Sequence, residues 1–178
     1  MRTLGDDYIL SPAQITGCAN IAEGCNGGWT EVAYKYVTNA GGIVQESTDP
    51  YPVKTSELGI TPTCPSTLTD QVVTVDDYFT LSSETAMASY MGSTGPISVC
   101  LDAESWNSYT GGVMSVCGNS VDHCVQAVGL NQDASTPYWI VRNSWGTSWG
   151  ESGYIYLKYG TNTCDITNDP TYVSVSNV

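Results

Sequence analysis

Basic residues are scarce in this chain. Five Lys and Arg stand against eighteen Asp and Glu, which gives a formal net charge of −13. Five cations are too few to neutralise a phosphate backbone or an anionic lipid surface. Nucleic acid and charged membranes are therefore not expected partners. The same field would attract cationic peptides, although an acid excess serves solubility equally well.

Histidine and long apolar runs are also scarce. The chain has one histidine and no run of 18 apolar residues, and residues 1–7 have neither a signal-peptide nor a transit-peptide pattern. We therefore expect no membrane insertion. One histidine beside paired cysteines leaves no structural-zinc ligand set, and residues 24–28 lack the Lys and Ser/Thr of a phosphate-binding loop. No metal and no cofactor are expected, while calcium at the acidic surface stays an open alternative.

Cysteines, in contrast, are plentiful. Seven cysteines in 178 residues indicate disulfides, and hence an oxidising compartment: the outside of the cell, a lysosome or vacuole, or another oxidising lumen. The odd count leaves one cysteine without a partner. A hydrophobic content of 41% is enough for the core of one domain or of two small lobes.

Helices are expected to precede strands along the chain. Capping and apolar spacing predict helices over 12–18, 29–39 and 82–91, the last ended by Gly92. The Pro-rich stretch 43–70 is expected to be ordered loop. Apolar runs predict strands over five segments: 96–101, 121–130, 138–143, 153–159 and 172–175. This order is typical of an α+β fold with segregated lobes.

Two of these strands would bring the histidine to an asparagine. If 121–130 and 138–143 form an antiparallel hairpin centred near Asp133, His123 faces Asn143 directly. The Asn amide would then fix the tautomer and orientation of the imidazole, as in a Cys-His-Asn nucleophilic site. For a lone histidine, a satisfied position at a strand edge is the ordinary alternative.

Three motifs carry a family resemblance. They are Gly24-Cys-Asn-Gly-Gly28, Cys117-Gly-Asn-Ser-Val-Asp-His123 and Asn143-Ser-Trp-Gly-Thr-Ser-Trp-Gly-Glu-Ser-Gly-Tyr154. In this order and spacing, the chain resembles the papain-like cysteine peptidases from Met1 to Val178. The resemblance implies a two-lobe α+β fold. Residues 1–70 would be the remainder of a helical lobe, and residues 71–178 a β-barrel lobe whose C-terminal strand crosses back.

The same resemblance assigns roles to the residues of these motifs. His123 would act as base and then acid, Asn143 would orient it, and Trp145 would shield their hydrogen bond with Ser144 beside it. The substrate would be a peptide or protein. Seven residues would contact it: Gly27, Gly28, Trp29, Cys100, Asp122, Cys124 and Asp169. A carboxylate at Asp169 would favour a basic side chain two residues before the scissile bond, although a solvated turn residue before a proline is an equal alternative.

The same family resemblance indicates which cysteines form disulfides and which stay free. The resemblance implies the disulfides Cys18–Cys64 and Cys117–Cys164. It also assigns Cys25 to a disulfide whose partner is absent, although a cysteine at a helix start is also a candidate nucleophile. Cys100 and Cys124 lie in apolar strands, where buried free thiols are the ordinary expectation and a third bridge is the alternative.

One departure from the family lies at the front of the chain. In the family, two features precede the region that resembles residues 1–4: a Gln of the oxyanion hole, and a segment of the Cys-Gly-Ser-Cys-Trp type that carries the nucleophile on the central helix. Neither is in this sequence. We therefore expect an incomplete fold and a chain that is inactive alone, with the thiolate supplied by a missing N-terminal segment or a second chain. The alternative is a non-catalytic papain-like subunit that serves a larger assembly as a structural or docking component.

Overall fold

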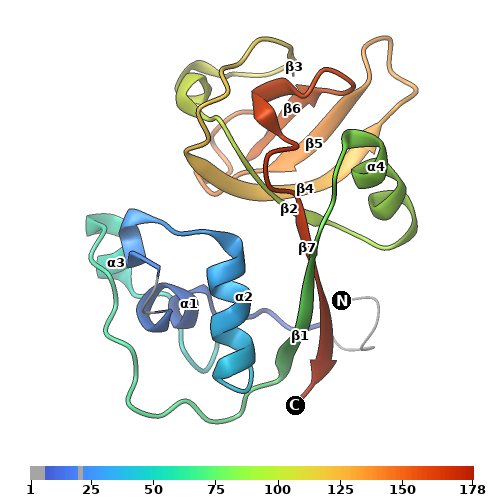
Figure 1. Ribbon diagram of the computed structural model, residues 1–178. Coiled ribbons are helices and arrows are strands. Elements are labelled where there is room, and N and C mark those ends of the chain that lie inside the picture. The colour runs from blue at the N-terminus through green and yellow to red at the C-terminus, as the bar shows by residue number, and fades with distance from the viewer. Residues whose placement is uncertain (1–6, 20–21) are drawn as a thin grey trace. The chain divides into compact units, whose positions relative to one another are not determined.

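The computed structural model describes residues 7–19 and 22–178, and the chain forms two compact units. Unit 1 comprises Met1–Tyr78 and Val173–Val178, and unit 2 comprises Phe79–Tyr172. Helices α1, α2 and α3 belong to unit 1, and helix α4 with strands β2 to β6 belongs to unit 2 (Figure 1). No helix in the described ranges is both long and apolar enough to cross a membrane.

Unit 1 is built on helices α1 (Pro12–Cys18), α2 (Thr30–Asn39) and α3 (Val53–Leu58), with the short helix η1 (Gly24–Asn26). Parts of two strands, β1 (Val73–Thr80) and β7 (Thr171–Asn177), complete it. Its buried core has four members: Val37, Ile43, Val73 and Val75. The core is small because α2 buries only one residue fully, Val37.

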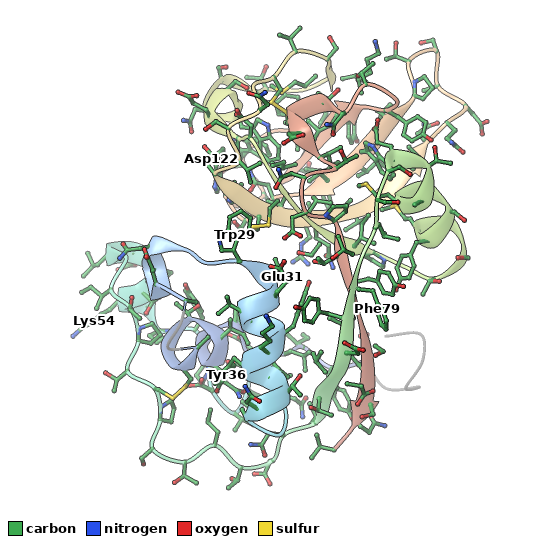
Figure 2. All side chains as sticks on the ribbon, viewed as in Figure 1. Trp29, Glu31, Tyr36, Lys54, Phe79 and Asp122 are labelled. Atoms are coloured by element: carbon green, nitrogen blue, oxygen red, sulfur yellow. A yellow bond between two sulfur atoms is a disulfide. The ribbon has the colours of Figure 1, made fainter. Side chains whose placement is uncertain are left out.

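The start of α1 follows the predicted cap in part. Ser11 Oγ accepts the N–H of Gln14 at 3.0 Å, and Pro12 occupies the first helical position, so the helix begins where expected. The Gln14 side chain does not return to the cap. Fully buried, it donates to Gly42 O and to the hydroxyl of Tyr36 (labelled on α2 in Figure 2), and it accepts the N–H of Val44 at 2.8 Å. It therefore ties α1 to α2 and to the strand-like segment that follows.

Unit 2 is organised by a sheet. Its strands are β2 (Ile97–Leu101), β3 (Val113–Met114), β4 (His123–Asn131), β5 (Tyr138–Arg142) and β6 (Tyr154–Lys158). With β1 and β7 the strand order is β1-β7-β2-β4-β5-β6-β3. The β3–β6 pair is short and parallel, whereas the β2–β7, β2–β4, β4–β5 and β5–β6 pairs are antiparallel. Helix α4 (Glu84–Ser93) and the short helices η2 (Glu104–Ser108) and η3 (Thr163–Asp165) complete the unit. Trp106, Trp139 and Met87 are the largest side chains of its core.

Several expected elements are confirmed and others are wrong. Helices α1, α2 and α4 and strands β2, β4, β5, β6 and β7 occur where the sequence predicts them, within two residues at most ends. The stretch 43–70, expected as loop, contains α3 between Pro52 and Gly59, and strand β1 was not predicted. Gly92 was expected to end the third helix, but α4 includes Gly92 and continues to Ser93, with Thr94 as its C-cap.

The β4–β5 hairpin differs from the predicted register by two residues at Gln126 and Ala127 and by three residues from Gly129 to Asn131. Ala127 pairs with Val141, and a bulge follows between Ala127 and Gly129. The turn lies further along than expected because Asn131 Oδ1 accepts the N–H groups of Asp133 and Ala134, which ends β4. Since side chains alternate with a period of two, the slip of two residues keeps the side chains up to Ala127 opposite partners on the predicted face, and the bulge changes the offset beyond it.

Candidate active site

His123 and Asn143 meet at the end of two neighbouring strands. His123 is the first residue of β4, and Asn143 directly follows β5. His123 Nε2 lies 2.9 Å from Asn143 Oδ1, which also accepts the N–H of Ser144 at 2.8 Å. A backbone N–H can only donate, so the atom it contacts is the amide oxygen. The imidazole must therefore donate through Nε2, and in the neutral ring Nδ1 then carries the lone pair.

Asn143 is itself held in place. Its backbone N–H donates to Gly153 O at 3.0 Å, and its side chain is buried. Its Nδ2 is buried and has no acceptor among the described residues. A fixed amide acceptor favours one imidazole tautomer, the one with an unprotonated Nδ1 that can take a proton from a thiol.

Aromatic rings surround the imidazole. Trp145 stacks on His123 with ring centroids 5.4 Å apart and an interplanar angle of 22°. Trp106, fully buried, meets the same ring edge-on, with centroids 6.0 Å apart and an angle of 83°. Trp145 remains 38% exposed. One face of the imidazole is therefore covered by a ring that is itself open to solvent, and an edge is packed against the core.

The sequence analysis missed the outer members of this aromatic cluster. Trp149 stacks on Trp106 at 5.9 Å, packs edge-on against Trp145 at 5.1 Å, and donates its Nε1–H to Trp106 O at 3.3 Å. Tyr109 in turn lies 5.5 Å from Trp149. Trp149 stands in the same Trp-Gly turn as Trp145, so its position in the motif was the available signal. Trp106 lies in η2 and carries no motif that could have found it.

Two carboxylates fix the backbone that leads into β4. Asp122 Oδ1 accepts the N–H of Ala103 at 2.8 Å, next to the Leu101–His123 pair of the β2–β4 ladder. Asp102, only 2% exposed, accepts the N–H of Ser120 at 2.8 Å. Both bonds join the end of β2 to the segment before His123. Asp122, predicted to contact substrate, is exposed and already binds backbone, and the sequence analysis did not single out Asp102.

The comparisons with known proteins agree with this geometry. The model of the papain family of cysteine proteases matches residues 1–174. The chain belongs to this family. Cysteine proteinase 1 of Dictyostelium discoideum is 42% identical over 162 residues, which cover 86% of this chain and 45% of that protein. Cysteine proteinase A of Leishmania mexicana is 39% identical over 170 residues, which cover 93% of this chain and 47% of that protein. The chain spans about half the length of the curated relatives it matches.

Solved structures give the same fold. A bromelain protease from Ananas comosus, solved with the E64 inhibitor, matches with a TM-score of 0.85 and 31% identity, over 97% of this chain and 80% of that one. Digestive procathepsin L 3 of Tenebrio molitor also matches with a TM-score of 0.85, at 32% identity, over 96% of this chain and 57% of that one. The expected papain-like α+β fold is confirmed.

Three disulfides are present in this member of the papain family. Cys18–Cys64 and Cys117–Cys164 are bridged, as the resemblance implies. Cys100 and Cys124 are also bridged, so the ordinary expectation of buried free thiols is wrong for this pair. The physical reason is register: these two residues are direct partners in the β2–β4 ladder, with Cα atoms 4.0 Å apart. Cys25, in η1, is exposed and is the one free cysteine of the described residues.

The remaining residues that the papain-family resemblance assigns to substrate lie on different elements. Gly27, Gly28 and Trp29 belong to unit 1, where they join η1 to α2, and Trp29 is 53% exposed. Gly27 has a φ of 112°, and a Cβ added there would meet nothing within 4 Å, while its N–H and C=O are both hydrogen-bonded within the loop, to Gly24 O and from Glu23 N–H. Asp169 is half-buried in unit 2, between η3 and β7.

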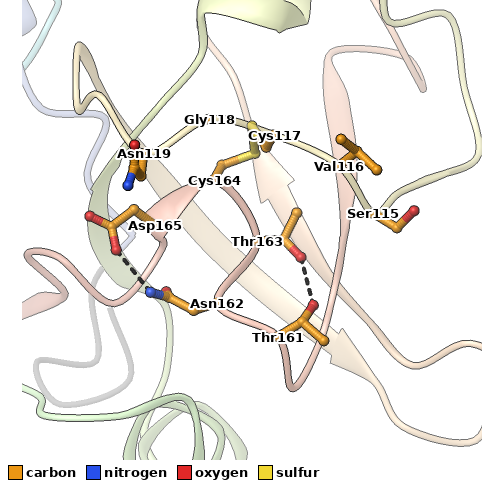
Figure 3. A pocket seen from close by; sticks show the side chains of 10 residues that line it. All are labelled: Ser115, Val116, Cys117, Gly118, Asn119, Thr161, Asn162, Thr163, Cys164 and Asp165. Carbon is orange, nitrogen blue, oxygen red and sulfur yellow. Dashed lines mark hydrogen bonds between the residues drawn. A yellow bond between two sulfur atoms is a disulfide. The ribbon is translucent and has the colours of Figure 1, made fainter.

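A depression of about 580 Å³ lies elsewhere in unit 2, around the Cys117–Cys164 bridge (Figure 3). It is lined by residues 115–119 and 161–165. Its polar groups are largely paired with each other: Asn162 donates to Asp165 at 2.8 Å, and the hydroxyls of Thr161 and Thr163 lie 3.0 Å apart. We therefore do not treat it as a chemical site. No three His, Cys, Asp or Glu side chains within 7–19 and 22–178 could together hold a metal ion.

Proposed function

We propose that this chain carries the base and the orienting group of a papain-family cysteine peptidase that hydrolyses peptide bonds. The hydrogen bond between His123 Nε2 and Asn143 Oδ1, fixed by the N–H of Ser144, is the observation that carries the proposal. His123 Nδ1 takes the proton of a cysteine thiol and later returns a proton to the leaving amine. Trp145 covers the imidazole and keeps water from competing for Asn143.

The thiol in this proposal comes from outside the 178 residues. All seven cysteines lie in the described ranges, six of them are bridged, and only Cys25 keeps a free thiol. Cys25 lies in the Gly24–Asn26 helix, which has only three residues and is too short to act as a helix N-terminal site. We assign Cys25 instead to a disulfide with the segment or second chain that brings the nucleophile. The chain alone is then inactive.

Within unit 1, Gly27, Gly28 and Trp29 are proposed to contact the peptide substrate. Within unit 2, Asp122 and Asp169 are proposed, separately, to contact its side chains. A carboxylate at Asp169 favours Arg over Leu two residues before the scissile bond. The three disulfides support a compartment that is oxidising, whether outside the cell or in a lysosome, a vacuole or another lumen.

The tautomer of His123 tests the proposal without any need for turnover. Because the chain has one histidine, two-bond ¹⁵N–¹H correlations report a single imidazole. We expect the neutral ring to carry its proton on Nε2, and we expect Asn143→Ala to abolish that preference while Asn131→Ala, in the β4–β5 turn, leaves it intact. A ring protonated on Nδ1 in the wild type would refute the assignment.

Turnover tests the second half of the proposal. We expect the chain alone to show no hydrolysis of a fluorogenic peptide and no reaction of Cys25 with an epoxide directed at catalytic thiolates. Hydrolysis by the chain alone that is lost in Cys25→Ser would make Cys25 the nucleophile and overturn the assignment.

A second candidate is a non-catalytic papain-like subunit. It is favoured by exposed apolar side chains in unit 1, each more than half exposed: Ile9, Trp29, Val53, Leu58 and Ile60. Co-purification with the cysteine-bearing segment or chain distinguishes the two. The peptidase assignment expects the complex to hydrolyse peptide with dependence on His123, and the subunit assignment expects a stable complex whose function survives His123→Ala.

A further inference from the structure

The outward face of strands β5 and β6 combines aromatic and cationic side chains. Along each strand, buried residues alternate with outward ones, which gives the β5–β6 outer face six members: Tyr138, Ile140, Arg142, Tyr154, Tyr156 and Lys158. They form three cross-strand pairs, Tyr138 with Lys158, Ile140 with Tyr156, and Arg142 with Tyr154. The hydrophobic core of unit 2 contains none of them, and five of the six are half-buried while Arg142 is exposed.

The charges on this face are unusual for the chain. Unit 2 has eight Asp and Glu but only two Lys and Arg, and both cations, Arg142 and Lys158, stand on the β5–β6 outer face. None of the eight acids is a member of it. Neither cation makes an ion pair with any described residue. In a protein with a net charge of −13, two unpaired cations on one face are the only attractive point for an acidic partner in unit 2.

The spacing of the two cations defines what fits between them. Arg142 and Lys158 stand at opposite ends of the three cross-strand pairs, a separation of four residues along the sheet and one strand across it. At about 3.4 Å per residue and 4.8 Å per strand, their Cα atoms are about 14 Å apart. Ile140 and Tyr156 lie midway, and the rings of Tyr138 and Tyr156 pack against each other at 4.6 Å. An apolar platform thus separates two cationic ends.

We propose that the β5–β6 outer face docks an extended acidic peptide segment of a partner protein, with carboxylates at positions i and i+4 and an apolar side chain at i+2. An extended chain places positions i and i+4 about 13 Å apart on one face, which matches the separation of the cations. The apolar side chain covers Ile140 and Tyr156, which desolvates the two ion pairs and orients the peptide. The acidic side chains elsewhere in unit 2 repel the peptide carboxylates when the peptide is shifted along the face.

Binding of a labelled peptide, Glu-Ser-Leu-Ser-Glu within a neutral flank, tests this docking by fluorescence anisotropy at low salt. We expect Arg142→Glu and Lys158→Glu each to weaken binding by about three- to tenfold. Lys54→Glu is the matched control, because it makes the same charge change on the exposed side chain of α3 in unit 1 (Figure 2) and is expected to change binding less than twofold. Circular dichroism checks that all three variants remain folded.

The peptide is varied in parallel. Adjacent glutamates, or Ser in place of Leu, should each weaken binding, since one breaks the spacing and the other removes the apolar contact. If Lys54→Glu weakened peptide binding as much as Arg142→Glu, the loss of affinity would come from the net charge of the protein alone, and the proposal would be overturned. Tighter binding of a sulfated polysaccharide with no dependence on peptide spacing would also overturn it, as would a concentration-dependent dimer in light scattering that Arg142→Glu dissolves.

Discussion

Asp102 and Ser120 are joined by a hydrogen bond of 2.8 Å between a buried carboxylate oxygen and a backbone N–H eighteen residues further along the chain. The other oxygen of Asp102 accepts the N–H of Glu104 at 3.1 Å. One buried carboxylate therefore shapes the exit from β2 and the entry to β4, and His123 opens β4 three residues after Ser120. The position of the imidazole depends on backbone bonds that involve no catalytic residue.

Asp102→Asn tests this dependence. The amide keeps one accepting oxygen and places an NH₂ group against the N–H of either Ser120 or Glu104, so one of these backbone donors loses its charged acceptor. We expect the free energy of unfolding to fall by about 1–3 kcal/mol in urea titrations. Asp133→Asn, in the exposed β4–β5 turn, makes the same chemical change and is expected to stay within about 0.5 kcal/mol. Equal stability of the two variants would contradict a structural role for Asp102.

Trp145 is expected to protect the His123–Asn143 hydrogen bond from solvent. A stacked aromatic pair contributes about 0.5–1.5 kcal/mol, which corresponds to a two- to tenfold change in local opening. Trp145→Ala should therefore raise the exchange rate of the His123 Nε2 proton by about that factor in NMR exchange measurements. Trp29→Ala removes an exposed tryptophan of unit 1 and should leave the rate unchanged. Unchanged exchange in Trp145→Ala would show that Trp106 alone provides the protection.

The cysteine pattern predicts a definite labelling result. Under native, non-reducing conditions iodoacetamide should modify one cysteine, Cys25, which is exposed and free. Peptide mapping should then find three bridges. Replacing both Cys100 and Cys124 by Ser should lower the free energy of unfolding by about 2–4 kcal/mol, because the bridge closes a loop of 24 residues in the unfolded chain. A second labelled cysteine in the folded protein would disprove the pairing.

The sequence predicts the centre of the site better than its surroundings. His123 and Asn143 could be paired from the pattern because polar residues at the ends of two adjacent apolar strands must lie near each other on one face. The predicted register was still wrong, by two residues before the bulge and by three after it, since the Asn131 turn and the bulge after Ala127 depend on local hydrogen bonds. The contact survived because an even slip preserves the face and because these side chains also reach a diagonal neighbour.

Long-range packing explains what the sequence could not predict. Trp106 reaches His123 only because η2 folds back on the core, and no spacing in 104–108 encodes that contact. Similarly, the Cys100–Cys124 bridge requires the β2–β4 register, in which the two residues are direct partners. Both apolar strand contexts were compatible with free thiols. Pairings of this kind are properties of the sheet and cannot be derived from either strand alone.

Three tyrosines make the stability of the fold sensitive to alkaline pH. Burial raises the pKa of Tyr90, Tyr109 and Tyr156 above the ordinary value of 10.0, and for Tyr109 and Tyr156 the nearby charge of Glu151 adds to the effect. The native state thus keeps these protons after the unfolded chain has lost them. Their contribution to stability is complete below about pH 10 and is lost as the pH rises through the higher native pKa values.

Tyr156→Phe isolates one of these groups. It removes the phenol while Tyr109 keeps its hydroxyl bonds to Gly112 O and to the backbone N–H at position 156. We expect unfolding free energies of variant and wild type to agree within about 0.5 kcal/mol at pH 7. Between pH 10 and 11.5 the variant should lose less stability than the wild type, in urea titrations followed by tryptophan fluorescence. An equal or steeper loss in the variant would show that the phenol of residue 156 does not couple to folding.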